Sequence, residues 1–466
     1  MVGQSKLLFV GNFVNDVIIN HRGLTIKRDR SFHDLDVSKI IKDYQQQQQQ
    51  QQQQTSSTSL ASSASLTETE TTDLTQSVGI SDRYEQSVNI VLGGSVTYGS
   101  LAASSFGGAT SYVVSEVGSD INQQFTTLID NNPHINIDHV ARSTETKTSS
   151  YQLDYYNNHK SRSLSLKSKG SPIDPVACLQ SINDIKPDAI FFVPVCAELD
   201  CAFVSNIVES IVNQPNQPQS QLYRPTVVAC DVQGFLRTFI GERVSTRPAL
   251  EMDRILQVVG RSFSRLGDKT ISIIKAEHGE AVAILGDHDP GTCAKLLCDK
   301  YGFTVACVTM GGNGGFVSSS QTGQLYVPTF KPTQVADETG CGDTFLTCLV
   351  LELLSVVSQR NKQLAVSTDP YDKLCNLYLT GEDILHCVQV GSAGASFLVE
   401  QIGPNGFGDR TKIIDRVTKG EKQPKVQYLQ WNKPKSMVLL SPGTYSQQQQ
   451  LQPKQQPIKS ITNYFV

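Results

Sequence analysis

Hydrophobic positions along the chain fall into two alternating patterns, short apolar runs and longer amphipathic stretches. In residues 198–214 and 251–263, apolar side chains recur every three or four positions, as they do on one face of a helix. The short apolar runs each predict a buried strand: KLLFVGN, SVNIVLGG, SYVVSEVG, AIFFVPVC, PTVVACD, TISIIKA and FTVACVTMGG. Strands that alternate with helices predict a doubly wound α/β fold, in which helices cover both faces of a mainly parallel sheet.

Three regions depart from this alternation. Residues 31–87 contain ten consecutive glutamines and a Ser/Thr-rich run, and residues 419–466 are again rich in glutamine. Both regions are too polar to offset the entropy lost on ordering, so we predict a disordered insertion and a disordered tail around one domain formed by residues 1–418. Residues 142–168 end in a polar, alternating stretch that predicts a small β lid.

Composition favours small molecules as partners. The chain has 466 residues, of which 39% are hydrophobic, and a formal charge of −4. No basic field over the whole chain argues for nucleic acid or an anionic membrane. The longest apolar helix, near 346–357, contains Glu352 and is shorter than the ~20 residues of a membrane span. The eleven cysteines include no C-x-x-C pair, which predicts reduced thiols in a cytoplasmic protein.

A cluster of small residues, Gly340-Cys341-Gly342, precedes Asp343 and a long apolar helix. Backbone amides at a helix N-terminus bind anions, and glycines let a phosphate approach them closely. A carboxylate beside a phosphate is repelled, so Asp343 is better explained as a base that takes the proton of an attacking hydroxyl. The alternative is that Asp343 only caps the helix, and a G-x-G-D string alone does not decide between the two.

The surrounding string DETGCGDTF resembles the C-terminal signature of the ribokinase-like, or PfkB, family of carbohydrate and nucleoside kinases. The resemblance implies that Gly340, Cys341 and Gly342 form the anion hole and that Asp343 is the catalytic base. Cysteine stands here where the family usually has alanine, a small-for-small change that should leave the amides in place.

Two N-terminal segments extend the resemblance. VGNFVNDVII is similar to the first strand of the family and puts Asp16 where acceptor hydroxyls are held. VLGGSVTYGS is similar to the di-glycine motif, in which Gly93 and Gly94 let the substrate approach the backbone. Four residues after the second glycine, where the family often has asparagine, this chain has Tyr98, which puts the common ribose- or fructose-type contact in doubt.

Later segments resemble the metal and nucleotide sites of the family. IIKAEHGEA resembles the N-x-x-E motif, which implies that Glu280 organises Mg²⁺ through water, while Glu277 replaces the asparagine. VTMGGNGGFV resembles the nucleotide loop, and VGSAGASFLVEQIGPNGF resembles the segment beside the adenine. The resemblance thus implies contacts to ATP from Thr309, Gly311, Gly314 and Gly394, with Ala393 and Ser396 next to the last of these. A glycine-rich turn and close helix packing are the structural alternatives.

The ordered set of motifs looks most like the plant-type PfkB inositol kinases. The expected function is transfer of the γ-phosphoryl of Mg-ATP to a hydroxyl of a sugar or polyol, with myo-inositol as a hypothesis. The alternative is a ribokinase-like module that binds without catalysis. A third class, the NAD-dependent oxidoreductases, is disfavoured because the chain lacks a G-x-G-x-x-G fingerprint.

Two further partners stay open at this point. The resemblance leaves open a homodimer formed through the lid. The final residues, 458–466, resemble the hydrophobic plug of sliding-clamp-binding peptides, but Ile458 replaces the usual glutamine, so a disordered tail is the favoured interpretation.

Overall fold

The structure of the protein is a computed structural model. It describes residues 4–26, 78–121, 123–157, 161–213, 223–366, 379–422, 426–428 and 437–439, together with positions 39, 41, 42, 45, 46 and 49. The clamp-like peptide at 458–466 and most of the Gln-rich insertion and tail lie outside the described residues.

A ten-stranded sheet forms the centre of the molecule, in the order β16-β15-β14-β13-β10-β9-β1-β4-β5, with β6 paired to β4. The strands from β14 to β5 run parallel, whereas β15 and β16 form an antiparallel hairpin at one edge. Their bounds are β1 Ser5–Val10, β4 Ala109–Val117, β5 Ile135–Asn136, β6 Val140–Arg142, β9 Ala189–Phe192, β10 Val227–Asp231, β13 Ile271–Glu277, β14 Val305–Thr309, β15 Gly315–Ser319 and β16 Gly323–Val327. The predicted doubly wound α/β fold is confirmed.

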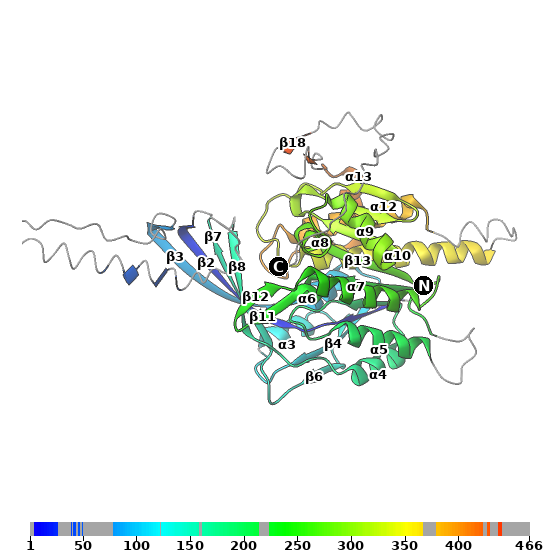
Figure 1. Ribbon diagram of the computed structural model, residues 1–466, viewed down its shortest axis with the longest axis horizontal. Coiled ribbons are helices and arrows are strands. Elements are labelled where there is room, and N and C mark those ends of the chain that lie inside the picture. The colour runs from blue at the N-terminus through cyan, green and yellow to red at the C-terminus, as the bar shows by residue number, and fades with distance from the viewer. Residues whose placement is uncertain are drawn as a thin grey trace, which may run out of the picture.

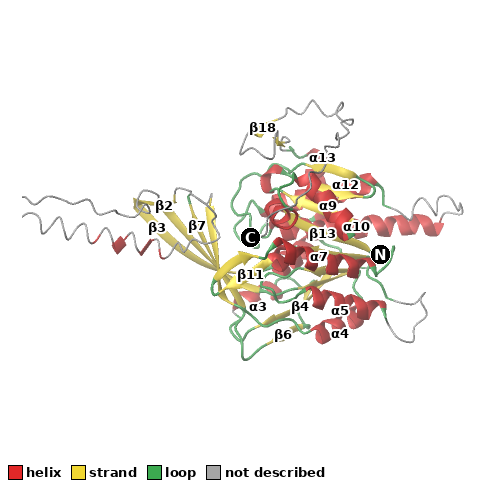
Figure 2. Ribbon diagram, viewed as in Figure 1, coloured by secondary structure: helices red, strands yellow, loops and turns green. Residues whose placement is uncertain are grey.

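Helices cover both faces of this sheet (Figure 1, Figure 2). On one face, α2, α10, α12 and α13 share a buried cluster with strand residues, and on the other α4, α5, α7, α8 and α9 share a second cluster. The bounds are α2 Ser95–Phe106, α3 Gln123–Asp130, α4 Pro175–Ile185, α5 Cys201–Val212, α6 Gln233–Leu236, α7 Ala249–Ser264, α8 His278–Leu285, α9 Pro290–Tyr301, η4 Gly311–Asn313, α10 Cys341–Val366, α12 Gly381–Leu398 and α13 Arg410–Lys419. Burial on two faces explains why the strands are apolar without alternation.

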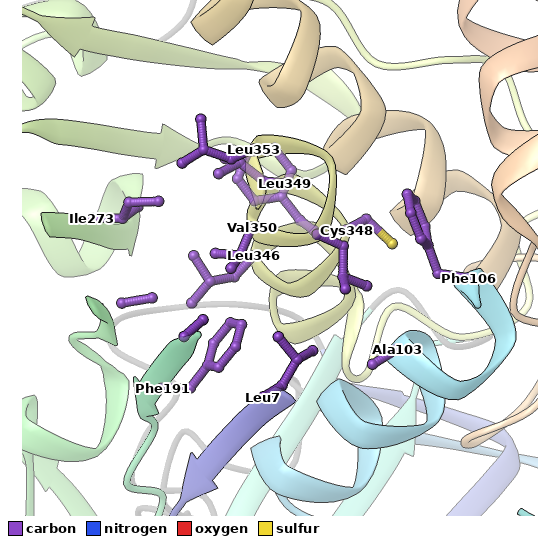
Figure 3. Packing of buried hydrophobic residues seen from close by; sticks show 14 of the residues in the cluster. Leu7, Ala103, Phe106, Phe191, Ile273, Leu346, Cys348, Leu349, Val350 and Leu353 are labelled. Atoms are coloured by element: carbon purple, nitrogen blue, oxygen red, sulfur yellow. The ribbon is translucent and has the colours of Figure 1, made fainter. Parts of the chain in front are cut away.

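Helix α10 is the central helix of the first face. Figure 3 shows Leu346, Val350 and Leu353 of this helix directed toward Phe191 of β9 and Ile273 of β13. The helix is longer than expected: residues 341–363 are long and apolar enough to cross a membrane by length and composition, yet 61% of the window is buried within the fold. Burial of this extent is typical of a core helix.

A separate six-stranded sheet, β11-β12-β8-β7-β2-β3, projects from one end of the body (Figure 1). It contains the strands of the predicted lid, and we refer to it by that name. The sequence predicted a lid only within 142–168, and it missed four of the strands. The bounds are β2 Val14–Ile26, β3 Val78–Gly93, β7 Ser149–Tyr156, β8 Ser161–Ser168, β11 Arg237–Ile240 and β12 Arg243–Thr246; a small hairpin, β17 Val426–Tyr428 with β18 Met437–Leu439, lies apart.

The expectation that residues 31–87 are disordered is wrong for its last ten positions. Strand β3 begins at Val78 and pairs antiparallel with β2, so residues 78–87 belong to the lid. Polar composition misled the prediction because an edge strand needs ladder hydrogen bonds more than apolar burial. The run SVNIVLGG is likewise not a buried strand, since Val88 and Ile90 are exposed.

Candidate active site

Charged residues gather where the parallel strands end. Asp231 is the last residue of β10 and lies in register with Lys275 of β13. Two residues after Lys275, Glu277 ends β13 and lies in register with Thr309, the last residue of β14. The carboxyl ends of adjacent parallel strands share one edge, so these side chains surround one region. Ligands of open α/β sheets bind at this edge.

Lys275 and Asp231 form a buried ion pair. Lys275 Nζ lies 2.8 Å from Asp231 Oδ2, and both side chains are buried. Burial by itself lowers the pKa of Lys275, but the charges of Asp231, Glu280 and Asp343 outweigh it, so the pKa is raised and the ammonium is kept. Sequence reasoning missed Lys275, although a lysine inside the apolar run TISIIKA was a signal, because a buried strand admits a charge only with a partner.

The Gly-Cys-Gly cluster forms the start of α10. The first intrahelical bond runs from the Thr344 N–H to the carbonyl of Gly340, which has a positive φ of 77°, and the Cys341 N–H donates to Glu338 O at 3.3 Å. The amides of Gly342 and Asp343 precede that first bond and therefore stand at the N-terminal end of the helix dipole. A Cβ on Gly342 would lie 2.5 Å from Lys275 Nζ, so the lysine ammonium lies directly beside this helix end.

Asp343 occupies the same helix end and is only partly exposed. Burial, and next the negative charge of Asp231, raise the pKa of its carboxyl to about 6, while Lys275, a hydrogen bond with Ser95 and Arg237 act in the opposite direction. A carboxylate with a pKa near neutrality is suited to accept a proton at physiological pH. Its position beside an ammonium and free helix amides fits the predicted base.

Asp16 lies against the glycine pair Gly93–Gly94, before the start of α2. A Cβ on Gly93 would lie 1.9 Å from Asp16 Oδ2, so the carboxylate rests on the glycine. Gly94, with φ 85°, would place a Cβ 2.5 Å from the carbonyl of Asn12, which explains why this turn into α2 uses glycine. The structure therefore brings the three predicted substrate residues together at the base of the lid.

Helix α2 joins the two halves of the site. Its first residue, Ser95, hydrogen-bonds Asp343, and the ring of Tyr98 packs on Gly340, where a Cβ would lie 2.0 Å from Tyr98 Cδ1. The residue that departs from the family pattern thus contacts Gly340 of the predicted anion hole. The sequence indicated the departure at Tyr98 but not this contact.

Glu280 caps α8 and faces the same ionic cluster. Its Oε2 accepts from the Glu277 N–H at 2.8 Å, and Glu277 accepts from the Gly279 N–H at 2.9 Å, which together form a capping box. Burial raises the pKa of Glu280 to about 7, and the charge of Lys275 opposes that rise. Helix capping explains why a glutamate stands at position 277. Glu280 takes part in the same capping box and also interacts electrostatically with Lys275.

The predicted nucleotide residues fall into two places. Thr309 ends β14 and donates to Ala276 O at 3.4 Å. Gly311 begins the 3-10 turn η4 and Gly314 directly follows it, both with positive φ. Gly394 lies elsewhere: in α12 it packs on α10, where a Cβ would lie 2.6 Å from Cys348 Sγ. Helix packing therefore explains glycine at 394 without a nucleotide.

Arg237, the first residue of β11, is held by contacts within the fold. Its Nη1 donates to Val195 O at 3.1 Å, and its guanidinium lies 5.4 Å from the ring centroid of Tyr151. Among the described residues, no group of three or more His, Cys, Asp or Glu side chains could hold a metal ion directly. Any metal at this site would have to be held largely by the phosphates and water.

A cavity of about 780 Å³ lies away from these residues. It is bounded by α2, α3 and residues 404–407 and includes none of the predicted site residues. The volume of this cavity does not make it the candidate site, because the charged groups lie together at the carboxyl edge of the sheet and not in the cavity.

Part of the sequence matches a known protein family, and the fold matches solved structures. Residues 261–409, which contain Lys275, Glu280 and Asp343, match the pfkB family carbohydrate kinase. The fold is ribokinase-like. A ribokinase from Arabidopsis thaliana, solved with ribose and ATP, is 13% identical at a TM-score of 0.50, with 89% of this chain and 98% of that chain covered.

Two further ribokinase-like structures show the same fold. A pyrophosphate-dependent kinase in the ribokinase family, solved with a pyrophosphate analog and myo-inositol, is 14% identical at a TM-score of 0.52, with 88% of this chain and 99% of that chain covered. A ribokinase from Giardia lamblia is 11% identical at a TM-score of 0.51, with 90% and 99% covered. No curated protein matches the sequence.

Proposed function

We propose that this protein transfers the γ-phosphoryl group of Mg-ATP to a hydroxyl of a sugar or polyol. One observation carries the proposal: a carboxylate with a raised pKa, Asp343, shares a helix N-terminus with the Lys275 ammonium and the Gly342 amide. Cation and amides neutralise charge that develops on phosphate oxygens, and the carboxylate takes a proton.

In the proposed reaction, the acceptor oxygen attacks the γ-phosphorus while Asp343 removes its proton. A new O–P bond forms, the bond from phosphorus to the ADP oxygen breaks, and the proton stays on the carboxyl until it is released to water. Asp16 and the Gly93–Gly94 backbone hold the acceptor. The β-sheet lid excludes water, which would otherwise compete as an acceptor.

Mg²⁺ and ATP fit the residues present. Bound Mg²⁺ would neutralise phosphate charge, and Glu280 would hold one of its waters, as expected for a cation that keeps several waters. Thr309, Gly311 and Gly314 would face the nucleotide, because they lie at the carboxyl edge of β14. Gly394 would lie behind the adenine without contacting it, since it packs on Cys348.

The proposal extends to the identity of the acceptor, to a homodimer and to a cytoplasmic location. Myo-inositol is the first acceptor to test, because a structural neighbour was solved with it. A homodimer through the lid is supported by the exposed Val88 and Ile90 on edge strand β3, since such an edge can pair with another chain. The described cysteines are free thiols, which suits a cytoplasmic protein.

An inactive binding module is the competing proposal. Burial makes an ionised Asp343 unfavourable, and a module without catalysis would have no use for such a group. The neutral amide of asparagine would serve a purely structural role at the same place.

The test is phosphate transfer from Mg-ATP to myo-inositol, ribose, fructose and adenosine by the wild type and by Asp343→Asn. We expect one acceptor to react and the folded variant to lose ~10²–10⁴ in rate, the usual contribution of a general base. Turnover by the variant at the wild-type rate would remove Asp343 from the mechanism. No turnover by the wild type would favour the binding module.

A further inference from the structure

The cavity bounded by α2, α3 and residues 404–407 has the size and the opening of a small-molecule site. Its volume of about 780 Å³ lies within the range of roughly 300–1,000 Å³ that is usual for such sites. Thr127, Asn131 and Asn405, which line it, are exposed, so a ligand can reach the cavity from solvent.

The apolar side chains that line the cavity belong to the core. Leu101 of α2 is buried in the cluster that α2 shares with α10 and α12, and Leu128 and Phe407 pack against the same cluster. Close packing in a core holds side chains in defined positions. These three residues therefore present a fixed apolar surface to the cavity.

Side-chain hydrogen bonds join the segments that enclose the cavity. Ser105 Oγ donates to Phe407 O at 3.0 Å, and Ser104 Oγ donates to Asn132 Oδ1 at 3.4 Å. Asn132 Nδ2 in turn donates to Leu128 O at 2.6 Å. Because α2, the end of α3 and the 404–407 loop are tied together in this way, the cavity is formed before any ligand binds, as most small-molecule sites are.

The polar groups in the cavity are hydroxyls and amides. Among the described residues that line it, none carries a charge. Hydroxyl and amide groups both donate and accept hydrogen bonds, as the hydroxyls of a sugar do. Asn405, for example, donates from Nδ2 to Ile402 O at 3.1 Å, and its amide has a second proton and a carbonyl oxygen for a ligand. A phosphate, by contrast, would enter without a cation to pair with its charge, which is unfavourable.

We propose that this cavity is a second, non-catalytic binding site for a neutral sugar or polyol. The hydroxyls and amides match the hydroxyls of such a ligand, and the surface of Leu101, Leu128 and Phe407 matches the C–H groups of its ring. The site differs from the proposed acceptor site, where hydroxyls meet carboxylates, and it shares no residue with it. The inference does not rest on the proposed kinase function, because binding requires no phosphate transfer.

The test measures binding by saturation-transfer NMR without ATP, with myo-inositol, ribose and fructose as probes. The protein carries Asp16→Asn, which weakens the proposed acceptor site, so that the cavity accounts for the remaining binding. We expect at least one probe to bind this protein. An excess of ribose 5-phosphate should not displace the probe, because the cavity offers no cation to the phosphate.

Thr127→Trp and Thr126→Trp, each added to Asp16→Asn, form a matched pair. Both threonines are exposed neighbours on α3, so both proteins should fold, but of the two only Thr127 lines the cavity. The tryptophan ring at position 127 should fill the space, so probe binding is lost there and kept with Thr126→Trp. Ser104→Phe, which fills the cavity from α2, should lose probe binding as well.

Three results would overturn the inference. They are the absence of binding of all three probes to the Asp16→Asn protein, equal probe binding by the Thr127→Trp and Thr126→Trp proteins, and displacement of the probe by ribose 5-phosphate. Each of them would leave the kinase proposal standing, because that proposal is tested by phosphate transfer with the wild type and Asp343→Asn.

Discussion

Helix α10 carries two acidic residues that the fold treats in opposite ways. Glu352, in the middle of the helix, accepts from Arg410 Nε at 2.8 Å and Nη2 at 2.7 Å, and it lies 3.1 Å from His386 Nε2. Burial alone would raise the pKa of Glu352, but these hydrogen bonds lower it. Asp343, in the first turn, has a raised pKa although Lys275 is near, because burial, and next the negative charge of Asp231, outweigh the effect of that ammonium.

The difference separates a carboxylate that stabilises the fold from one that is suited to accept a proton. Glu352 has partners that match its charge, so its ionised form stabilises the contact between α10, α12 and α13. Asp343 shares one cation, Lys275, with two other carboxylates. Its ionised form is therefore less stable in the fold than in water, and the carboxyl binds a proton more readily. Four substitutions, one of them with a matched control, test this contrast.

Lys275→Met should have the largest effect. It leaves Asp231, Glu280 and Asp343 without their cation, and loss of one member of a buried pair costs roughly 3–5 kcal/mol of stability. Transfer activity should fall by ~10²–10³ as well, because a charge at the anion hole is lost. Denaturant unfolding and turnover measure both. A variant as stable and active as the wild type would mean that Lys275 does not hold the cluster.

Gly340→Ala should come next. A Cβ would lie 2.0 Å from the Tyr98 ring, and the positive φ of Gly340 adds strain, so we expect a loss of ~1–3 kcal/mol. Gly342→Ala is the control, because Gly342 has no positive φ and its Cβ would meet the end of the Lys275 side chain instead of a ring, so stability should change less. Equal melting temperatures for the two variants would contradict the packing of Tyr98 on the anion hole.

Glu352→Gln should reduce stability by about 1–3 kcal/mol at pH 7 and leave kcat unchanged in the folded fraction. Since the pKa of Glu352 is lowered in the fold, its contribution is present above its ordinary value of 4.5 and is lost as pH falls through the lowered pKa. Unfolding curves of the variant and the wild type should therefore converge in acid. A constant difference at every pH would show that the charge is not involved.

Cys341→Ala should have the smallest effect. The thiol makes only a long contact to Ala395 O at 3.7 Å, and the proposed anion binding uses backbone amides. Turnover should stay within about twofold and stability within ~1.5 kcal/mol, as for other swaps of similar volume. A large loss of activity would mean that the sulfur itself takes part.

Sequence patterns predicted the parts of the molecule that depend on local chemistry. Most of the apolar strands, the long helix at the Gly340–Gly342 cluster and the positions of Asp16 with Gly93 lie where the motifs indicated. Each follows from neighbours in the chain, through periodicity or a glycine that a turn requires.

Contacts between distant segments could not be predicted in this way. Lys275 pairs with Asp231 across 44 positions, and β3 pairs with β2 across the Gln-rich insertion, so neither partner is visible locally. Tyr98 packs on Gly340, which is far along the chain. A local motif can also mislead. Gly394 belongs to a segment that resembled a nucleotide site, but its contact with Cys348 explains the glycine by helix packing.

The most direct test of the account is the pH dependence of kcat/KM for the acceptor, which reports the groups of the free enzyme. Asp343 must be ionised to act as a base, and its pKa is about 6, so the rate should fall about tenfold per pH unit below that value and level off above it. Asp343→Asn should be slower by ~10²–10⁴ and show no such step.

The stability of Asp343→Asn provides the control. The raised pKa means that the stability contributed by protonated Asp343 is present below its ordinary value of 3.8 and is lost as pH rises through about 6. The asparagine variant should therefore be at least as stable as the wild type above pH 6, so its low rate cannot come from unfolding. A wild-type profile that is flat through pH 6, or a variant that keeps the wild-type rate, would contradict the account.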